Sequence, residues 1–256
     1  MKHYPALVDL GCFSRSDLVS LTGSREAANS MIYSYQKKNL IRHVRRDLFV
    51  TISLETKQPI SNRFLIGSRI APDACISHTS AFAYHGYANQ VSYDVYVTTA
   101  SRFREFTFDG YSYHPLPLKS YTGITTREDR VRVTEIERTV IDYIDDFETI
   151  GGLEELMSCL SLVPRLDSDK MLSYLHEKGS MFLWQKTGLI LERMQNNLML
   201  PKSFFTECQS RLPQSKRYLY RGLQGEENRI NKPWRIYIPS NFELTLTQGV
   251  AFNARV

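Results

Sequence analysis

The sequence predicts an α+β fold: an N-terminal winged helix-turn-helix, then a domain in which an antiparallel sheet precedes helices. Three observations support this. Residues 14–52 have the pattern of two short helices and a basic hairpin, residues 93–133 alternate with period two, and residues 134–194 have helical periodicity. We expect the winged helix at 1–58, the α+β domain at 63–200, and a basic aromatic extension at 201–256 that is either separate or part of the second domain.

The first helix pair has clear boundary signals. Ser14 followed by Asp17 resembles a capping box, with Asp in the place of the usual Glu or Gln. Gly23 suits a left-handed helix end, and Ser24 can cap a second helix that begins at Arg25 and ends near residue 38. One face of that second helix has the spacing of a buried stripe, made of Ala28, Met31, Ile32 and Tyr35.

The opposite face of the second helix carries polar, aromatic and cationic side chains, which suit the major groove of DNA. The expected groove contacts are Arg25, Asn29, Tyr33 and Lys37. A hairpin follows, with arginines at its turn, and cations in such a wing would meet phosphates or the minor groove. The expected phosphate contacts are Lys38, Arg42, Arg45 and Arg46.

Charge placement favours a nucleic-acid partner over an ordinary surface helix pair. Residues 1–66 hold 10 basic and 5 acidic side chains, so their net charge of +5 equals that of the whole chain. Residues 67–201 have a net charge of −5, and residues 202–235 again have +5. The excess positive charge therefore coincides with the segment whose pattern already suggests DNA binding.

Composition limits the class of protein to which the chain can belong. The chain has 256 residues, 42% of them hydrophobic and 23% charged, as expected of a globular protein. It has no apolar run of about 18 residues and no signal-peptide core, so no membrane partner is expected. The four cysteines are far apart in the sequence, which argues against a zinc or redox motif and favours the reducing cytoplasm.

The second domain is expected to change from strands to helices. Alternating apolar residues mark strands at 93–97, 106–108, 111–113 and 131–133, and Asp109-Gly110 is a strong hairpin turn. Helical stripes follow at 134–146, 153–163, 168–178 and 181–194, the first with a cap at Thr134. The closely spaced strands predict an antiparallel sheet.

Chemical motifs in this domain are weak. His78, Ser80 and His85 have neither metal-ligand spacing nor a nucleophile motif, so packing or capping is the favoured interpretation. Glu135, Arg138 and Asp142 are spaced three and four residues apart, which predicts a solvated ion-pair row. An acidic Mg²⁺ site in the same run, which also contains Glu137, is the alternative. No phosphate-binding glycine motif is present. We therefore expect no catalytic residue, no metal and no cofactor.

The basic aromatic stretch at 216–221 has two interpretations. A sheet edge with alternating solvated arginines is the favoured interpretation. The alternative is nucleic-acid binding, since these side chains suit stacking and phosphate contacts.

The order of segments resembles the AbiEi-type antitoxins, the regulatory half of bacterial type IV toxin–antitoxin systems that act in abortive infection and phage defence. The resemblance covers about residues 3–195 and rests on the order of its motifs. They are FSRSDL at 13–18, KKNLIR at 37–42, ISHTSAFAYHG at 76–86, VRVTEIERTVID at 131–142, the Gly151-Gly152 pair and the 179–194 helix. Asp47 stands where such proteins usually have glycine in the wing turn.

The resemblance implies a repressor that binds inverted repeats in its own promoter through the winged helix. It also implies an antitoxin domain at 63–200 that counteracts a nucleotidyltransferase-like toxin without a tight complex. We assign antitoxin function to His78, Ser80, Glu137, Arg138 and Asp142. Two alternatives stay open: a stand-alone transcription regulator with a ligand-sensing second domain, and an enzyme such as a kinase that acts on the toxin.

Overall fold

The chain has a mixed α+β fold. The computed structural model describes residues 2–88 and 90–243, and the last 13 residues of the predicted extension lie outside them. Two compact units are present: one contains residues 1–76 and 93–133, and the other contains residues 77–92 and 134–256. The domain boundaries expected from the sequence stay a prediction. None of the described helices is long and apolar enough to cross a membrane.

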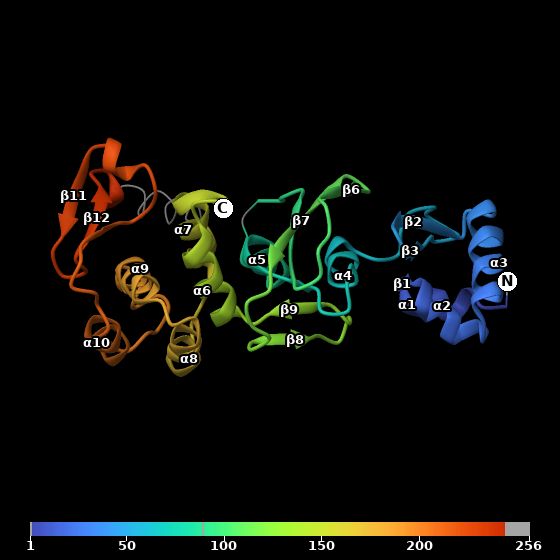
Figure 1. Ribbon diagram of the computed structural model, residues 1–256, viewed down its shortest axis with the longest axis horizontal. Coiled ribbons are helices and arrows are strands. Elements are labelled where there is room, and N and C mark those ends of the chain that lie inside the picture. Colours follow the sequence, from blue (N-terminus) through green and yellow to red (C-terminus); the bar gives the residue numbers. More distant parts are fainter. Residues whose placement is uncertain (1, 89, 244–256) are drawn as a thin grey trace. The chain divides into compact units, whose positions relative to one another are not determined.

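The first unit begins with three helices and a small sheet (Figure 1). The elements are α1 (Tyr4–Leu10), β1 (Cys12–Ser14), α2 (Arg15–Thr22), α3 (Arg25–Lys37), β2 (Ile41–Arg45) and β3 (Leu48–Thr51). The strands form an antiparallel sheet in the order β1-β3-β2. Buried apolar side chains from all three helices and from the sheet form one core, which includes Leu7, Phe13, Leu18, Ala28, Ile32 and Phe49.

Local signals set the boundaries of α2 and α3 as the sequence predicts. The Ser14 hydroxyl accepts the Asp17 backbone N–H while the Asp17 carboxylate accepts the Ser14 backbone N–H, which completes the capping box. Gly23 ends α2 with φ 84°, a left-handed conformation that glycine adopts without steric cost. Ser24 then accepts the Ala27 backbone N–H and caps α3.

The helix α4 (Arg63–Ser68) and a six-stranded sheet form the rest of the first unit. The strands are β4 (Cys75–Ile76), β5 (Asp94–Thr99), β6 (Phe106–Phe108), β7 (Tyr111–Pro117), β8 (Ile124–Thr126) and β9 (Arg132–Thr134), whose last residue belongs to the second unit. The strand order is β6-β7-β5-β4-β9-β8. The predicted hairpin is present between β6 and β7, with φ of 51° at Asp109 and 81° at Gly110, as a type I′ turn requires.

The prediction that this whole sheet is antiparallel is wrong. β5 pairs parallel with β7, and β4 pairs parallel with β9, whereas the β4–β5 and β6–β7 pairs are antiparallel. The reason is the connection at 100–105, which carries the chain past the position next to β5. The hairpin then places β7 in that position, so that β7 runs in the same direction as β5.

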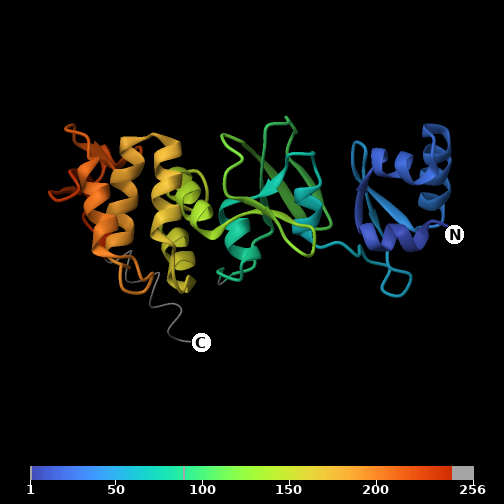
Figure 2. The ribbon, with the colours of Figure 1, turned by 90° about the horizontal axis from the view of Figure 1, so that it is seen from below.

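The second unit is mainly helical. Its helices are α5 (His78–Tyr84), α6 (Ile136–Asp146), α7 (Gly152–Leu162), α8 (Ser168–Lys178), α9 (Met181–Glu192) and α10 (Lys202–Ser210). Figure 1 views α8, α9 and α10 nearly along their axes, and Figure 2 shows them side by side. The helix expected from Thr134 begins instead at Ile136 without a side-chain cap, because the Thr134 hydroxyl bonds the Thr139 hydroxyl at 2.7 Å.

A small sheet after α10 packs on α9. It contains β10 (Arg217–Tyr218), the 3₁₀ turn η1 (Leu223–Gly225), β11 (Asn228–Asn231) and β12 (Ile236–Pro239), with strand order β10-β12-β11. The indole N–H of Trp234 donates to Glu192 at 2.8 Å, and Gln185 donates to the Trp234 carbonyl at 2.6 Å. A Cβ at Gly188 would lie 2.1 Å from the Trp234 ring, so glycine is required for this close approach.

Candidate functional site

The exposed face of α3 carries the four residues that the sequence assigns to a DNA groove. Arg25, Asn29, Tyr33 and Lys37 follow one another at intervals of four residues, and all four are exposed, Tyr33 with 72% of its surface. The opposite face is buried through Ala28, Met31, Ile32 and Tyr35. The helix therefore has a buried side and a polar side. These four residues form the central row of the polar side, and the row contains no carboxylate.

Arg15, which the sequence analysis did not single out, links α2, α3 and the β2–β3 turn. Its Nε lies 2.6 Å from Oδ1 of Asp47, and its Nη1 donates to Oδ1 of Asn29. The Arg15 hydrogen bond, with weaker help from Arg46, lowers the pKa of the Asp47 carboxyl below its usual range. The two partners are 14 and 32 positions from Arg15 in the sequence, so no local pattern could have revealed the link.

The Asn29 amide is oriented by this link. Because its oxygen accepts a hydrogen bond from Arg15, the amide presents its NH₂ group as the remaining donor. A donor group without a free acceptor beside it matches an acceptor on a base edge, such as guanine O6 or N7, better than the paired donor and acceptor of adenine.

The predicted phosphate contacts of the hairpin fall into two groups. Lys38 and Arg46 are exposed, and the Arg46 side chain has 92% of its surface accessible. Arg42 instead forms an ion pair with Asp109 at 3.2 Å, and the Arg45 guanidinium lies over the rings of Phe103 and Phe106 at 5.1 and 5.4 Å. Arg42 and Arg45 therefore already have partners within the first unit.

The β2–β3 turn has an aspartate at a left-handed position. Asp47 has φ 59°, and aspartate is among the few residues other than glycine that adopt this left-handed region readily. Its carboxylate is held by Arg15 at 2.6 Å and lies 3.8 Å from Arg46. The turn therefore has a left-handed conformation that glycine would also allow, but it carries a negative charge.

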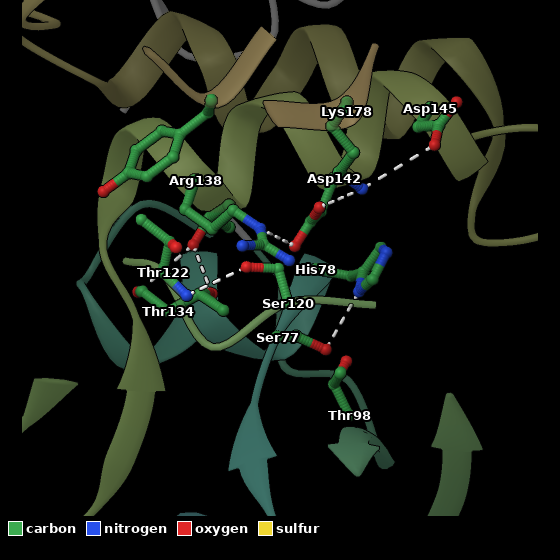
Figure 3. Close-up of polar contacts among 12 residues, drawn as sticks. Ser77, His78, Thr98, Ser120, Thr122, Thr134, Arg138, Asp142, Asp145 and Lys178 are labelled. Carbon is green, nitrogen blue, oxygen red and sulfur yellow. Dashed lines mark hydrogen bonds and ion pairs between the residues drawn. The ribbon is translucent and has the colours of Figure 1, made fainter. Parts of the chain in front are cut away.

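A buried charge cluster occupies the second unit, and it corrects the expected solvated ion-pair row. Arg138 and Asp142 on α6 are only 3% and 4% exposed. Arg138 Nε lies 2.7 Å from Asp142 Oδ2, and Lys178 Nζ from α8 lies 2.6 Å from Asp142 Oδ1. Figure 3 shows the carboxylate of Asp142 between the two cationic side chains. Helical spacing alone could not distinguish the buried face of α6 from an exposed one.

The electrostatics of this cluster keep Asp142 ionised. Burial by itself would raise the pKa of the Asp142 carboxyl, but Lys178 and Arg138, together with His78, outweigh it and lower that pKa. Lys178 also lies 3.7 Å from Asp145. The buried Lys186 of α9 donates to the Asp145 carbonyl at 2.8 Å, which connects a further helix to the same region.

His78 lies at the beginning of α5 in a constrained position. Its side chain is buried, with Nδ1 2.9 Å from the Ser77 hydroxyl and Nε2 3.4 Å from Asp146. Its φ of 52° is left-handed, a conformation that costs roughly 1–2 kcal/mol for a residue with a Cβ. The hydrogen bonds and burial hold this backbone in place, and they connect α5 to the end of α6.

The remaining candidates are Glu137, Ser80 and His85. Glu137 accepts the Asp167 backbone N–H at 3.1 Å, whereas Asp142 on the same helix is held by cations, so the two acids do not share a Mg²⁺ position. Ser80 is buried within α5. His85 contacts the Thr134 carbonyl at 2.8 Å. Among the described residues, no group of His, Cys, Asp and Glu side chains is arranged to hold a metal ion.

The comparisons with known proteins inform the fold alone. No family model matches the chain, and no curated protein matches it. Among solved structures, the chain is similar to the crystal structure of the RV2827C protein from Mycobacterium tuberculosis, with a TM-score of 0.63 and 12% sequence identity. The likeness covers 94% of this chain and 89% of that chain, so both share a mixed α+β architecture over nearly their whole length.

Proposed function

We propose that the N-terminal segment is a winged helix that binds duplex DNA, with α3 in the major groove and the β2–β3 turn against the backbone. The observation that carries this proposal is the central row on α3: Arg25, Asn29, Tyr33 and Lys37 are all exposed on one capped helix. The small antiparallel sheet beside it ends in the exposed Arg46. The local charge excess supports a polyanionic partner.

We further propose that the protein is a cytoplasmic antitoxin that represses its own operon. The resemblance to AbiEi-type antitoxins supports this, with promoter inverted repeats as the DNA target and a nucleotidyltransferase-like toxin as the functional partner. The proposal assigns no catalytic step to this chain. Because His78, Arg138 and Asp142 are buried, their contribution to antitoxin function would be to hold α5, α6 and α8 together, not to contact a toxin directly.

Duplex binding by the full-length protein tests the first part. The probe is a fluorescent duplex that spans the region upstream of the protein's own gene, titrated at several salt concentrations. Arg25→Gln with Lys37→Gln should weaken binding by roughly tenfold or more and lower the salt slope by about 0.9 for each phosphate that is no longer neutralised. Arg229→Gln is the matched control, since it removes an exposed cation of the second unit. Equal weakening in the control would contradict the assignment of α3.

Co-expression with the neighbouring gene tests the antitoxin role. If that gene encodes a nucleotidyltransferase-like toxin, the full chain should restore the growth of cells that express it. The Arg25→Gln, Lys37→Gln variant, with its weakened DNA binding, should restore growth as well. Failure of the full chain to restore growth would reject the antitoxin role and leave the stand-alone regulator. Loss of rescue only in the DNA-binding variant would show that the two activities are not separable.

A further inference from the structure

The second unit contains a cleft that the proposed function does not involve. It has a volume of about 530 Å³ and is lined by side chains and backbone of Glu148, Phe182, Arg217, Tyr218, Tyr220, Arg221, Gly222 and Gln224. Most of these residues lie in the short segment 217–224, whereas Glu148 follows the end of α6 and Phe182 is the second residue of α9. The volume falls within the range of natural small-molecule sites.

Two guanidinium groups in this cleft differ from those of three other arginines in the second unit. Arg193, Arg211 and Arg229 each form an ion pair with a glutamate, at distances from 2.7 to 3.5 Å. Within residues 2–88 and 90–243, the guanidinium groups of Arg217 and Arg221 have no carboxylate partner, and both residues are exposed. They are therefore available to bind an anion.

One of the two guanidinium groups is oriented by an aromatic ring. The Arg217 guanidinium lies 5.3 Å from the centre of the Phe182 ring, a cation–π distance that leaves the N–H groups at its edge free to donate. Glu148, the single acid of the cleft, already accepts the Arg221 backbone N–H at 2.8 Å. A planar, oriented guanidinium suits the bidentate binding of a phosphate group.

The aromatic side chains of the cleft are also held in place. Tyr218 stacks on Tyr237, with ring centres 4.7 Å apart and planes inclined by 20°. The Tyr220 hydroxyl donates to Glu226 at 2.7 Å, and burial together with this bond raises the pKa of Tyr220 to about 12. Rings fixed beside unpaired arginines are the combination that binds stacked bases and their phosphates.

We propose that this cleft binds a nucleotide unit, with its base against the tyrosine rings and its phosphate on Arg217 and Arg221. The unit would be either a free nucleotide or one residue of a single-stranded nucleic acid. The surroundings favour the strand, because residues 202–235 carry 8 basic and 3 acidic side chains and so attract a polyanion. This site is separate from α3 in the sequence and does not depend on the proposed operator binding.

Titration of the full-length protein tests this proposal. The probes are AMP, CMP, GMP and UMP, inorganic phosphate, and labelled RNA and DNA hexanucleotides. Mononucleotides and hexanucleotides should bind, and Arg217→Gln with Arg221→Gln should weaken both by about tenfold or more. Tyr218→Leu should weaken mononucleotides by about tenfold while leaving inorganic phosphate unchanged, since it removes stacking alone.

Controls separate this site from α3 and from unspecific charge effects. Arg229→Gln removes an exposed cation outside the cleft and should change affinity less than about twofold. Arg25→Gln with Lys37→Gln should leave mononucleotide binding unchanged. Tryptophan fluorescence checks folding, because both tryptophans, Trp184 and Trp234, lie in the second unit. If the double variant unfolds, Arg221→Gln alone replaces it and should lower the affinity at least about threefold.

The outcomes are distinct. Tighter binding of the hexanucleotide than of any mononucleotide identifies a strand as the ligand, and equal binding identifies the free nucleotide; both support the site. The proposal is overturned if no nucleotide probe binds up to about 5 mM, or if Arg217→Gln with Arg221→Gln binds like the wild type. It is also overturned if inorganic phosphate binds as tightly as the mononucleotides, because the base would then contribute nothing.

Discussion

The guanidinium of Arg15 at the first residue of α2 lies 2.6 Å from the carboxylate of Asp47 in the β2–β3 turn. The Arg15 backbone N–H also donates to the Asp47 carbonyl at 3.0 Å, so two hydrogen bonds fix the turn to the helix. In the proposed complex with DNA, this carboxylate would lie beside phosphates and would compete with them for Arg15. Asp47 is therefore a residue that limits affinity in the proposed interface.

Asp47→Asn should tighten duplex binding. The substitution removes a negative charge from the β2–β3 turn and leaves Arg15 free to bind a phosphate, while asparagine tolerates the left-handed φ of this turn. We expect a gain of up to about fivefold, equivalent to ~1 kcal/mol for an exposed charge, and a steeper salt dependence. Fluorescence anisotropy at several salt concentrations measures both. Unchanged affinity and slope would place the turn away from the DNA.

Arg46→Ala should weaken duplex binding more than Arg45→Ala does. Arg46 is exposed, whereas the Arg45 guanidinium lies over Phe103 and Phe106. Each phosphate that a protein no longer neutralises lowers the salt slope by about 0.9, and we expect that decrease for Arg46→Ala alone. The same salt titration measures it for both variants. A larger decrease for Arg45→Ala would show that this side chain leaves the two rings when DNA binds.

Asn29→Ala should relax base preference by a modest amount. Since the Asn29 oxygen accepts from Arg15, only its NH₂ group remains for a base edge, and one such hydrogen bond contributes about 0.5–1.5 kcal/mol. Binding to a set of duplexes with single base changes measures the loss of discrimination. Discrimination above about 2 kcal/mol at an adenine would mean that Arg15 releases the amide for a bidentate contact.

Asp142→Asn should destabilise the second unit by about 3–5 kcal/mol at pH 7. The substitution keeps the shape of the side chain but removes the carboxylate charge that the buried Arg138 and the mostly buried Lys178 both contact, while Asp145 stays 3.7 Å from Lys178. Urea unfolding followed by tryptophan fluorescence measures the change, since both tryptophans belong to this unit. Glu207→Gln breaks an exposed pair with Arg211 and is the control, with an expected loss below about 1 kcal/mol.

The loss of stability caused by Asp142→Asn should depend on pH in a direction that the pKa of Asp142 determines. The pKa of Asp142 is lower in the folded protein than its unfolded value of about 3.9, so ionised Asp142 stabilises the fold at higher pH. This stabilisation is lost as the pH falls below about 4 and through the folded pKa. The gap in stability between wild type and Asp142→Asn should therefore narrow in acid. A constant gap from about pH 7 to about pH 3 would assign the loss to packing.

Gly188→Ala should destabilise the contact between α9 and the C-terminal sheet. Alanine is about 1 kcal/mol better than glycine within a helix, but its Cβ would overlap the Trp234 ring, and overpacking costs about 1–3 kcal/mol. We expect a net loss of up to about 2 kcal/mol in urea unfolding. Trp234→Leu removes the ring, and in that background Gly188→Ala should be neutral or stabilising. If Gly188→Ala lowers the stability of the wild type and of Trp234→Leu equally, a clash with the Trp234 ring is excluded.

Part of the candidate site could be predicted from the sequence because its signals are local. The exposed row on α3 follows from helical periodicity, and Ser24 and Gly23 mark where that helix begins and where α2 ends. Arg15 could not be found in this way, because its role depends on residues 14 and 32 positions away. The cleft of Arg217 and Phe182 was also missed, although the stretch at 216–221 had suggested aromatic and basic contacts.

The sequence by itself determined the mixed α+β order, the capping box at Ser14, the helix from Arg25, and the Asp109-Gly110 hairpin, since each depends on residues a few positions apart. Only the tertiary structure decided that β5 and β7 run parallel and that the charges of Arg138 and Asp142 are buried. The physical reason is the range of the interactions. Hydrogen bonds within a turn or a helix end are encoded locally, whereas strand order and burial depend on which distant segment occupies the adjacent space.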